Sequence, residues 1–322
     1  MIITKTPLRI SFTGGGTDLP DYYGIDGGAV VSAGINKYMY ITVNPKFDHK
    51  IRVSYSKTEI VDEVEELRHD IVKECLYMVG IKGGIEITSI ADIPSGTGLG
   101  SSSAFTVGLL NALYTYVGAR LSAGELARSA CEIEIGVLKH PIGKQDQYAA
   151  AYGGLNYFKF NKDETVTRSR ISLSEADERN MRQKLMLFYT GMTRSADDVL
   201  REQKSNTMDK LAVLDYMKNQ AGRMYDTLSQ TGFNEEFGKM LHDGWMHKKT
   251  LASSISDPAI AEYYDKALEA GAVGGKLLGA GGGGFLLFYC DEALQPQVEE
   301  AVGLRRVDFH VESNGSRVVF FA

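Results

Sequence analysis

The stretch that most constrains the fold of this chain is PSGTGLGSSSAF, residues 94–105, which is rich in glycine and serine and contains no lysine. Upstream, residues 83–90 alternate apolar and polar side chains with the period of two that is typical of a strand. Downstream, apolar residues recur at helical spacings and predict a helix from about Ser102 to Val117. The predicted order is therefore strand, glycine-rich loop and helix.

A loop of this composition before a helix is suited to binding phosphate groups. The first turn of a helix leaves backbone N–H groups unpaired, and the helix dipole makes them electropositive. Glycines allow a polyphosphate to approach the backbone closely, and serine hydroxyls can donate to phosphate or ligate Mg²⁺. An ordinary turn followed by a serine N-cap would have the same composition, so the loop alone leaves both interpretations open.

Two further glycine clusters favour a large ligand. GGKLLGAGGGGFLLFYC, residues 274–290, places a run of glycines before an apolar strand, where neither a strand interior nor a helix interior would favour them. PLRISFTGGGTDLPDYY, residues 7–23, places another cluster after an apolar strand. Each cluster alone fits a structural turn. Together they predict a ligand that the backbone approaches closely in several places.

The overall composition narrows the class of protein. The 322 residues are enough for one large or two ordinary domains, and 43% hydrophobic with 24% charged residues is typical of a soluble globular protein. The net charge of -6 argues against a nucleic-acid or anionic-membrane partner. Three cysteines without a C-x-x-C pair favour reduced thiols, and no apolar run approaches the ~20 residues that span a bilayer. We expect a cytoplasmic protein.

The three glycine-rich segments, in their order along the chain, resemble the three motifs of the GHMP kinases, which are named for galactokinase, homoserine kinase, mevalonate kinase and phosphomevalonate kinase. PSGTGLGSSSA is similar to the family's P-x-x-x-G-L-G-S-S-A motif, and PLRISFTGGGTD and GGKLLGAGGGGFLL are similar to the first and third motifs. The resemblance implies an α+β fold of two domains. Residues 1–183 would form an ATP-binding domain like the second domain of ribosomal protein S5, and residues 184–322 a ferredoxin-like domain.

The resemblance implies that ATP and Mg²⁺ bind at the second motif. The residues that it assigns to ATP are Pro94, Gly96, Gly98, Leu99, Gly100, Ser101, Ser102 and Ser103. The family also has a Mg²⁺-binding glutamate on the helix that precedes the catalytic aspartate, and Glu134 matches it, with Ser102 as the best co-ligand.

The residues around Glu134 are consistent with that role. Ser122 and Glu125 predict a capping box, from which a helix continues to about Leu138. At helical spacings, Glu134 has only small or apolar neighbours, which are Ala127, Ala130, Val137 and Leu138. A carboxylate on such a face costs several kcal/mol unless it is paired or binds a metal. The alternative is a glutamate at the helix edge that reaches water.

Asp146, in GKQDQYAAAYGG, is the catalytic aspartate that the resemblance implies. From the residues alone it could equally cap a turn or the segment that follows. Arg9, on the first strand, is expected to orient Asp146 or to stabilise the transferring charge, and a purely structural ion pair is the alternative.

The first motif departs from the galactokinase pattern, in which a Gly-Glu-His-x-Asp run contacts the sugar. Here residues 14–18 keep the aspartate but have glycine in place of glutamate and histidine, which disfavours galactose and opens space. FTGGGTD and HPIGKQDQYAAAYGG are most similar to the branch with D-glycero-D-manno-heptose 7-phosphate kinases and the kinase domain of fucokinases. The residues expected to bind the substrate are Asp18, Gly15, Gly16, Thr17, Arg194, Lys144 and Gly282, with Lys5 and Lys276 as rival cations for its phosphate.

The resemblance therefore predicts an ATP-dependent kinase for the anomeric hydroxyl of D-glycero-α-D-manno-heptose 7-phosphate, in GDP-heptose synthesis. A fucokinase-like or other sugar-1-kinase is the nearest alternative, and a catalytically silent sugar sensor of the same fold is a second. The expected partner is the small-molecule sugar phosphate, without nucleic acid or membrane, and a homodimer is left open.

Overall fold

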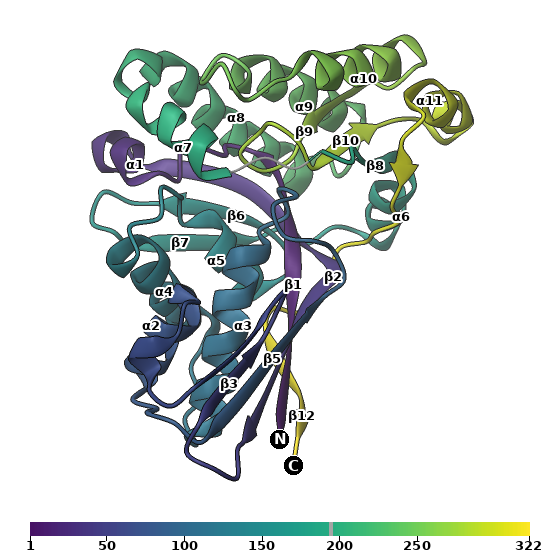
Figure 1. Ribbon diagram of the computed structural model, residues 1–322. Helices are drawn as coiled ribbons and strands as arrows, with labels where there is room; N and C mark the ends of the chain where they lie inside the picture. Colours follow the sequence, from purple (N-terminus) through teal and green to yellow (C-terminus); the bar gives the residue numbers. More distant parts are fainter. Residues whose placement is uncertain (193–195) are drawn as a thin grey trace.

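The structure of the protein is a computed structural model that describes residues 1–192 and 196–322. The described strands form two sheets, one in each of two α+β units (Figure 1). The first sheet has the order β12-β1-β2-β5-β3-β4, and β6 pairs with both β2 and β7. Its strands are β1 Ile2–Thr13, β2 Gly28–Pro45, β3 Ile51–Ser54, β4 Thr58–Val61, β5 Ile85–Ala91, β6 Leu155–Phe160, β7 Val166–Arg170 and β12 Arg317–Phe321.

Strand β1 runs from the chain terminus into the junction between the two units. At residues 2–5 buried and half-buried side chains alternate, whereas residues 6–13 are buried without interruption. The pattern changes because β1 contacts helices of both units, α3 and α5 from the first and α8 and α9 from the second. The first glycine cluster follows β1 directly and therefore lies at this junction.

Helices α2, α3, α4 and α5 gather on one side of the long strands of the first sheet (Figure 1). The helices of this unit are α1 Pro20–Asp26, α2 Asp70–Val79, α3 Ser101–Tyr116, α4 Ala123–Cys131, α5 Gln145–Tyr152 and α6 Glu175–Lys184, with a short 3₁₀ turn at Val64–Glu66. Helix α3 is buried along most of its length, in agreement with the helix predicted after the serine-rich loop. No helix of the described ranges is long and apolar enough to cross a bilayer.

The second unit has the strand order β11-β8-β10-β9. Its elements are β8 Leu185–Tyr189, α7 Ala196–Ser205, α8 Leu211–Gln230, α9 Glu235–Lys248, α10 Pro258–Glu269, β9 Gly274–Leu277, β10 Phe285–Tyr289, α11 Gln295–Val302 and β11 Arg305–Arg306, with 3₁₀ turns at Met208–Lys210 and Glu292–Leu294. Numbered along the chain, these strands have the spatial order 4-1-3-2 of a ferredoxin-like sheet. The expected α+β architecture is thus confirmed.

The end of the chain returns to the first unit. Strand β12 pairs antiparallel with β1, with Ile2 opposite Phe321, so the two termini lie side by side (Figure 1). The last strand of the predicted domain 184–322 therefore lies in the first sheet. We still propose a domain boundary near residue 184, with the second domain ending before β12.

The helix predicted from Ser122 to Leu138 has two parts. Helix α4 begins with the capping box that Ser122 and Glu125 predict. From Glu132 to Val137 the chain then winds as a π-helix, whose wider turn rotates the side chains that follow. Glu134 is fully buried, whereas Val137 is 51% exposed. The expectation that Val137 shares the buried face with Glu134 is wrong, because α-helical spacing does not apply here.

Candidate active site

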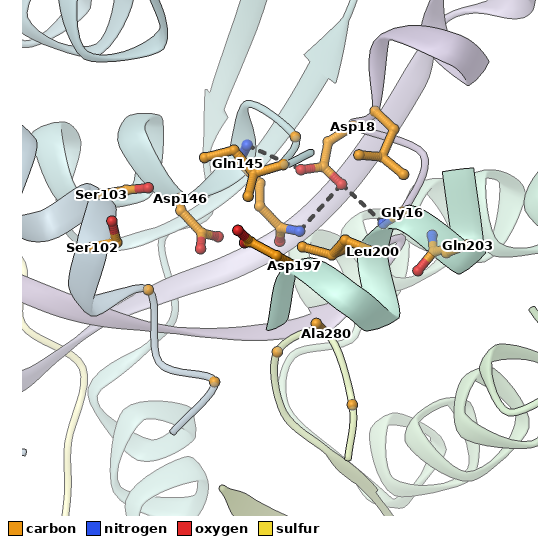
Figure 2. A pocket seen from close by; sticks show the side chains of 18 of the residues that line it. Gly16, Asp18, Ser102, Ser103, Gln145, Asp146, Asp197, Leu200, Gln203 and Ala280 are labelled. Atoms are coloured by element: carbon orange, nitrogen blue, oxygen red, sulfur yellow. Dashed lines mark hydrogen bonds between the residues drawn. The ribbon is translucent and has the colours of Figure 1, made fainter. Parts of the chain in front are cut away.

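A cavity of about 240 Å³ lies where the three glycine-rich segments meet (Figure 2). Its walls come from both units. The lining residues are Arg9, Gly15, Gly16, Asp18, Leu19, Gly96, Gly98, Gly100, Ser101, Ser102, Ser103, His140, Ile142, Gly143, Gln145, Asp146, Asp197, Leu200, Gln203, Lys248, Gly279, Ala280, Gly281 and Gly283. The cavity therefore collects most of the site residues that the sequence predicts.

The second and third glycine segments touch through their backbones. A Cβ on Gly98 would lie 2.4 Å from the Leu278 carbonyl oxygen, and a Cβ on Gly279 would lie 2.4 Å from Gly98 Cα. Gly98 and Gly100 also have φ of 81° and 72°, in the left-handed region that side chains disfavour. Helix α3 begins after Gly100, so the serine N-cap of the alternative interpretation is absent. Within the described part of the chain, no side chain caps the first turn.

Asp146, in the first turn of α5, is held by Arg9 of β1. The Arg9 guanidinium donates from Nε to Asp146 Oδ1 at 2.7 Å and from Nη2 to Oδ2 at 2.8 Å, while its Nη1 donates to the Gly98 carbonyl at 2.6 Å. Arg9 is buried, but the Asp146 side chain is 23% exposed, on the cavity wall. The two-pronged ion pair fixes the carboxylate beside the glycine-rich loop.

Glu134 lies behind the serines of that loop. Ser102 Oγ donates to Glu134 Oε1 at 3.0 Å, and Gln147 Nε2 donates to Oε2 at 2.7 Å. Burial raises the pKa of Glu134 to about 7, against the opposing hydrogen bonds from Gln147, Ser103 and Ser102. A raised pKa shows that these neutral donors do not fully offset desolvation of the carboxylate.

The oxygen atoms around Glu134 suit a hard divalent cation. They are the carboxylate, the Ser102 hydroxyl and the Gln147 Oε1, which is buried and has no hydrogen-bond partner among the described residues. Within the described ranges, no group of three or more His, Cys, Asp and Glu side chains gathers around one point. A metal at this place would thus be held by few protein ligands and would share its coordination with a bound phosphate, as is usual for Mg²⁺.

Asp18 is almost completely buried beside the first glycine cluster. Its carboxylate accepts from the Gly16 N–H at 2.9 Å and from the backbone N–H and side-chain amide of Gln145, both at 3.2 Å (Figure 2). Burial raises the pKa of Asp18, and the Asp146 charge adds to the shift. A Cβ on Gly143 would lie 2.0 Å from Asp18 Oδ2, so the chain after the π-helix packs directly on this carboxylate.

Two predicted glycines beside Asp18 have different surroundings. At Gly15 the nearest atoms to an added Cβ lie at 3.4 Å, an ordinary contact distance. At Gly16, with φ of 107°, an added Cβ would lie 2.3 Å from Gln203 Nε2. The space expected beside Gly16 is therefore filled by the side-chain amide of Gln203, which comes from α7.

Several predicted substrate or ATP residues do not line the cavity. The Thr17 hydroxyl donates to the backbone carbonyls of Gly14 and Ala29, at 2.8 and 2.9 Å. Lys144 donates to the Glu164 carboxylate and lies over the Tyr23 ring at 4.6 Å. Three more predicted residues do not line the cavity. Leu99 is in the hydrophobic core, and Pro94 is on the exposed turn before the loop. The Gly282 N–H donates to the Ile255 carbonyl. Arg194 lies outside the described residues.

Sequence reasoning missed the part of the wall that comes from α7 and α9. Asp197, Leu200 and Gln203 of α7 line the cavity, as does Lys248 at the end of α9. Lys248 lies in the polar run HKK, a pattern that is typical of a solvent-exposed surface. Its side chain is nevertheless buried. No local pattern in the sequence of these two helices indicates a ligand.

The chain matches two family descriptions. Residues 65–154 match the GHMP kinases N terminal domain, and residues 225–306 match the GHMP kinases C terminal domain. The chain is 31% identical over 305 residues to the D-glycero-alpha-D-manno-heptose 7-phosphate kinase of Campylobacter jejuni, covering 90% of this chain and 89% of the relative. It is 29% identical over 345 residues to the L-fucokinase/L-fucose-1-P guanylyltransferase of Bacteroides fragilis, covering 94% of this chain but 35% of that longer protein.

Solved structures share the whole fold. A D-glycero-D-manno-heptose 1-phosphate kinase from Bacteroides thetaiotaomicron has a TM-score of 0.82 at 26% identity and covers 100% of both chains. Lactococcus lactis galactokinase complexed with galactose has a TM-score of 0.75 at 18% identity, a likeness of fold alone, over 98% of this chain and 94% of that one. The chain belongs to the GHMP kinases and is a phosphotransferase that has an alcohol group as acceptor.

Proposed function

We propose that this kinase transfers the γ-phosphoryl group of ATP to the anomeric hydroxyl of D-glycero-α-D-manno-heptose 7-phosphate. The observation that carries the proposal is the Asp146 carboxylate, held by Arg9 at the point where the glycine-rich segments converge. The choice of sugar is supported by the similarity to the Campylobacter jejuni heptose 7-phosphate kinase. We place the enzyme in the cytoplasm, in GDP-heptose synthesis.

Asp146 is the proposed base. Its carboxylate accepts the proton of the anomeric hydroxyl, whose oxygen forms a bond to the γ-phosphorus as the bond between that phosphorus and the β–γ bridging oxygen breaks and ADP leaves. Arg9 holds the carboxylate in one orientation with two hydrogen bonds. Its guanidinium also offsets negative charge near the transferring group.

The glycine-rich loop from Gly96 to Ser103 is the proposed cradle for the triphosphate, with backbone N–H groups at the start of α3 as donors. Glu134 and Ser102, with Gln147 Oε1, are the residues that would hold Mg²⁺, which would supply positive charge against the phosphate oxygens. Asp18 is the proposed anchor for a sugar hydroxyl, because its carboxylate is buried at the cavity wall and fixed by Gln145.

A panel of acceptors tests the proposed substrate. The rate of ADP release is measured with ATP and, in turn, heptose 7-phosphate, the free heptose, mannose, fucose and galactose. We expect kcat/KM to be highest for heptose 7-phosphate and far lower for each free sugar. Equal or better turnover of fucose would favour the fucokinase-like alternative, and a protein that binds sugars without ADP release would be the silent sensor.

A further inference from the structure

Lys248 is a buried cation on the wall of the proposed site. Its side chain is only 5% exposed, and its ammonium group donates to the Gly279 carbonyl of the third glycine segment. Among the described residues it forms no ion pair with a carboxylate. An ammonium group has three N–H donors, and a buried charge without a carboxylate partner is costly, so this lysine is suited to an anionic ligand group.

The other candidate lysines have different surroundings. Lys144 pairs with Glu164, and the Lys276 ammonium donates to the Phe12 carbonyl at 3.0 Å. Lys5 lies 3.7 Å from the centre of the Tyr38 ring. None of these three lines the cavity, whereas Lys248 does.

The neighbours of Lys248 place it on the acceptor side of the cavity. A Cβ on Gly15 would lie 3.9 Å from Lys248 Nζ and 3.4 Å from Gln145 Nε2, the amide that donates to Asp18. Gln203 Nε2, beside Gly16, is a second buried donor, and it has no partner within the described structure. A cation and an unpaired amide therefore flank the first glycine cluster, next to the carboxylate proposed to bind the sugar.

We propose that Lys248 binds the phosphate group that the acceptor already carries and so makes the enzyme prefer a phosphorylated sugar to the free sugar. The inference rests on the proposed function, because it assigns a residue to that substrate's phosphate. Gln203 adds a neutral donor to the same phosphate. Arg9, which is already bound to Asp146, serves the transferring group instead.

The test compares three variants with the wild type. Lys248→Met removes the charge but keeps a side chain of similar length, and Lys248→Arg keeps the charge. Lys249→Met is the matched control, because Lys249 is the next residue, lies near the Trp245 ring and does not line the cavity. For each, kcat/KM is measured for heptose 7-phosphate and for the free heptose, beside thermal unfolding and calorimetric binding of the sugar phosphate.

We expect Lys248→Met to lower kcat/KM for heptose 7-phosphate by about 10- to 100-fold, since a hydrogen bond to a charged group is lost. In the same variant, kcat/KM for the free heptose should change little. Lys248→Arg should keep much of the wild-type kcat/KM for heptose 7-phosphate, and Lys249→Met should match the wild type with both sugars. An equal loss for both sugars would overturn the inference and place Lys248 at the transferring phosphoryl group. A wild type without preference for the phosphorylated sugar would instead contradict the proposed function itself.

Discussion

Three carboxylates of the site have different hydrogen-bonding partners and are therefore suited to different chemical roles. Asp146 is bound by a guanidinium, Asp18 by backbone and amide N–H groups, and Glu134 by a hydroxyl and an amide. Of these three, only Asp146 combines a positively charged partner with partial exposure on the cavity wall. The Arg9 guanidinium therefore holds this carboxylate in one orientation, where it can still reach a substrate hydroxyl.

Asp146→Asn is expected to lower kcat by about 10²–10⁴-fold, the usual contribution of a positioned general base. Asparagine has nearly the same shape but does not accept the hydroxyl proton. The binding of ATP and of the sugar phosphate should persist, because neither depends on that proton transfer. Steady-state kinetics and calorimetry measure the two effects separately. A variant that keeps more than about a tenth of the wild-type kcat would rule out an essential base.

Glu134→Gln is expected to raise the Mg²⁺ concentration needed for half-maximal activity while the fold is kept. The amide keeps the shape and one oxygen of the buried side chain but lacks the negative charge that a divalent cation favours. Calorimetric titration of ADP with and without Mg²⁺ gives a readout that does not depend on turnover. Should the variant show the wild-type Mg²⁺ dependence in both measurements, Glu134 would be a structural residue.

The pH dependence of the enzyme should report on Lys248. Burial and the Arg9 charge lower its pKa to about 8, while the carboxylates of Asp18 and Asp146 oppose the shift. Lys276, also buried, has a pKa lowered well below its ordinary value by its own burial and the Lys248 charge. As pH rises through about 8, Lys248 loses its proton, so kcat/KM for the phosphorylated sugar should fall. In Lys248→Arg, whose guanidinium stays charged, this fall should be absent.

The same lysine has a predictable effect on stability. The unfolded chain keeps this proton up to the ordinary value of 10.5, whereas the folded protein releases it near 8. Between those values the unfolded state binds more protons, so the wild type should gain stability as pH rises. Lys248→Met should lack that gain. A melting temperature whose pH dependence is identical in the two proteins would show that Lys248 is not a buried, shifted cation.

At the scale of elements, the glycine-rich segments are joined by backbone contact. Gly98 and Gly96 both have positive φ, 81° and 75°, so alanine is strained at either position. Gly98 also faces the third segment, where a Cβ would collide with the Leu278 carbonyl. Apart from the chain neighbours of Gly96, no described residue has an atom within 4 Å of a Cβ on that glycine. A comparison of alanine substitutions at these two glycines therefore distinguishes the effect of backbone strain from the effect of the contact between the segments.

Gly98→Ala is expected to destabilise the protein by more than Gly96→Ala, which should cost about 1–2 kcal/mol from strain alone. It should also weaken nucleotide binding more, because the two glycine-rich segments must move apart. Denaturant unfolding and calorimetric titration of ADP measure both effects. Equal losses in the two variants would mean that the contact between the segments contributes nothing.

Local patterns predicted the elements well where their period was regular. The strand before the serine-rich loop, helix α3 and the capping box of α4 appear in the structure close to where they were expected. The π-helix after α4 was not predicted. Within it, Glu134 is hydrogen-bonded to Ser102 and Gln147, which are distant contacts that local propensity does not encode.

At the scale of the whole molecule, the site depends on contacts between residues that are far apart in the chain. Arg9 and Asp146 are separated by 137 positions, and the sequence suggested the pair only after the family resemblance had assigned Asp146 its role. Lys248 and Gln203 were missed, because their helices carry no local sign of a ligand and reach the cavity only when the second unit packs on β1. The return of β12 to β1 was likewise invisible in the sequence.

The central claim is that this cavity phosphorylates the anomeric oxygen of a sugar that already carries a phosphate. The most direct measurement is ³¹P NMR of the product formed from ATP and heptose 7-phosphate, with the Asp146→Asn protein as the control. We predict a new phosphate-ester resonance coupled to the anomeric proton and an unchanged 7-phosphate resonance. With the variant, the new resonance should be absent over the same time. A new phosphate on any other oxygen, or on the 7-phosphate itself, would contradict the account.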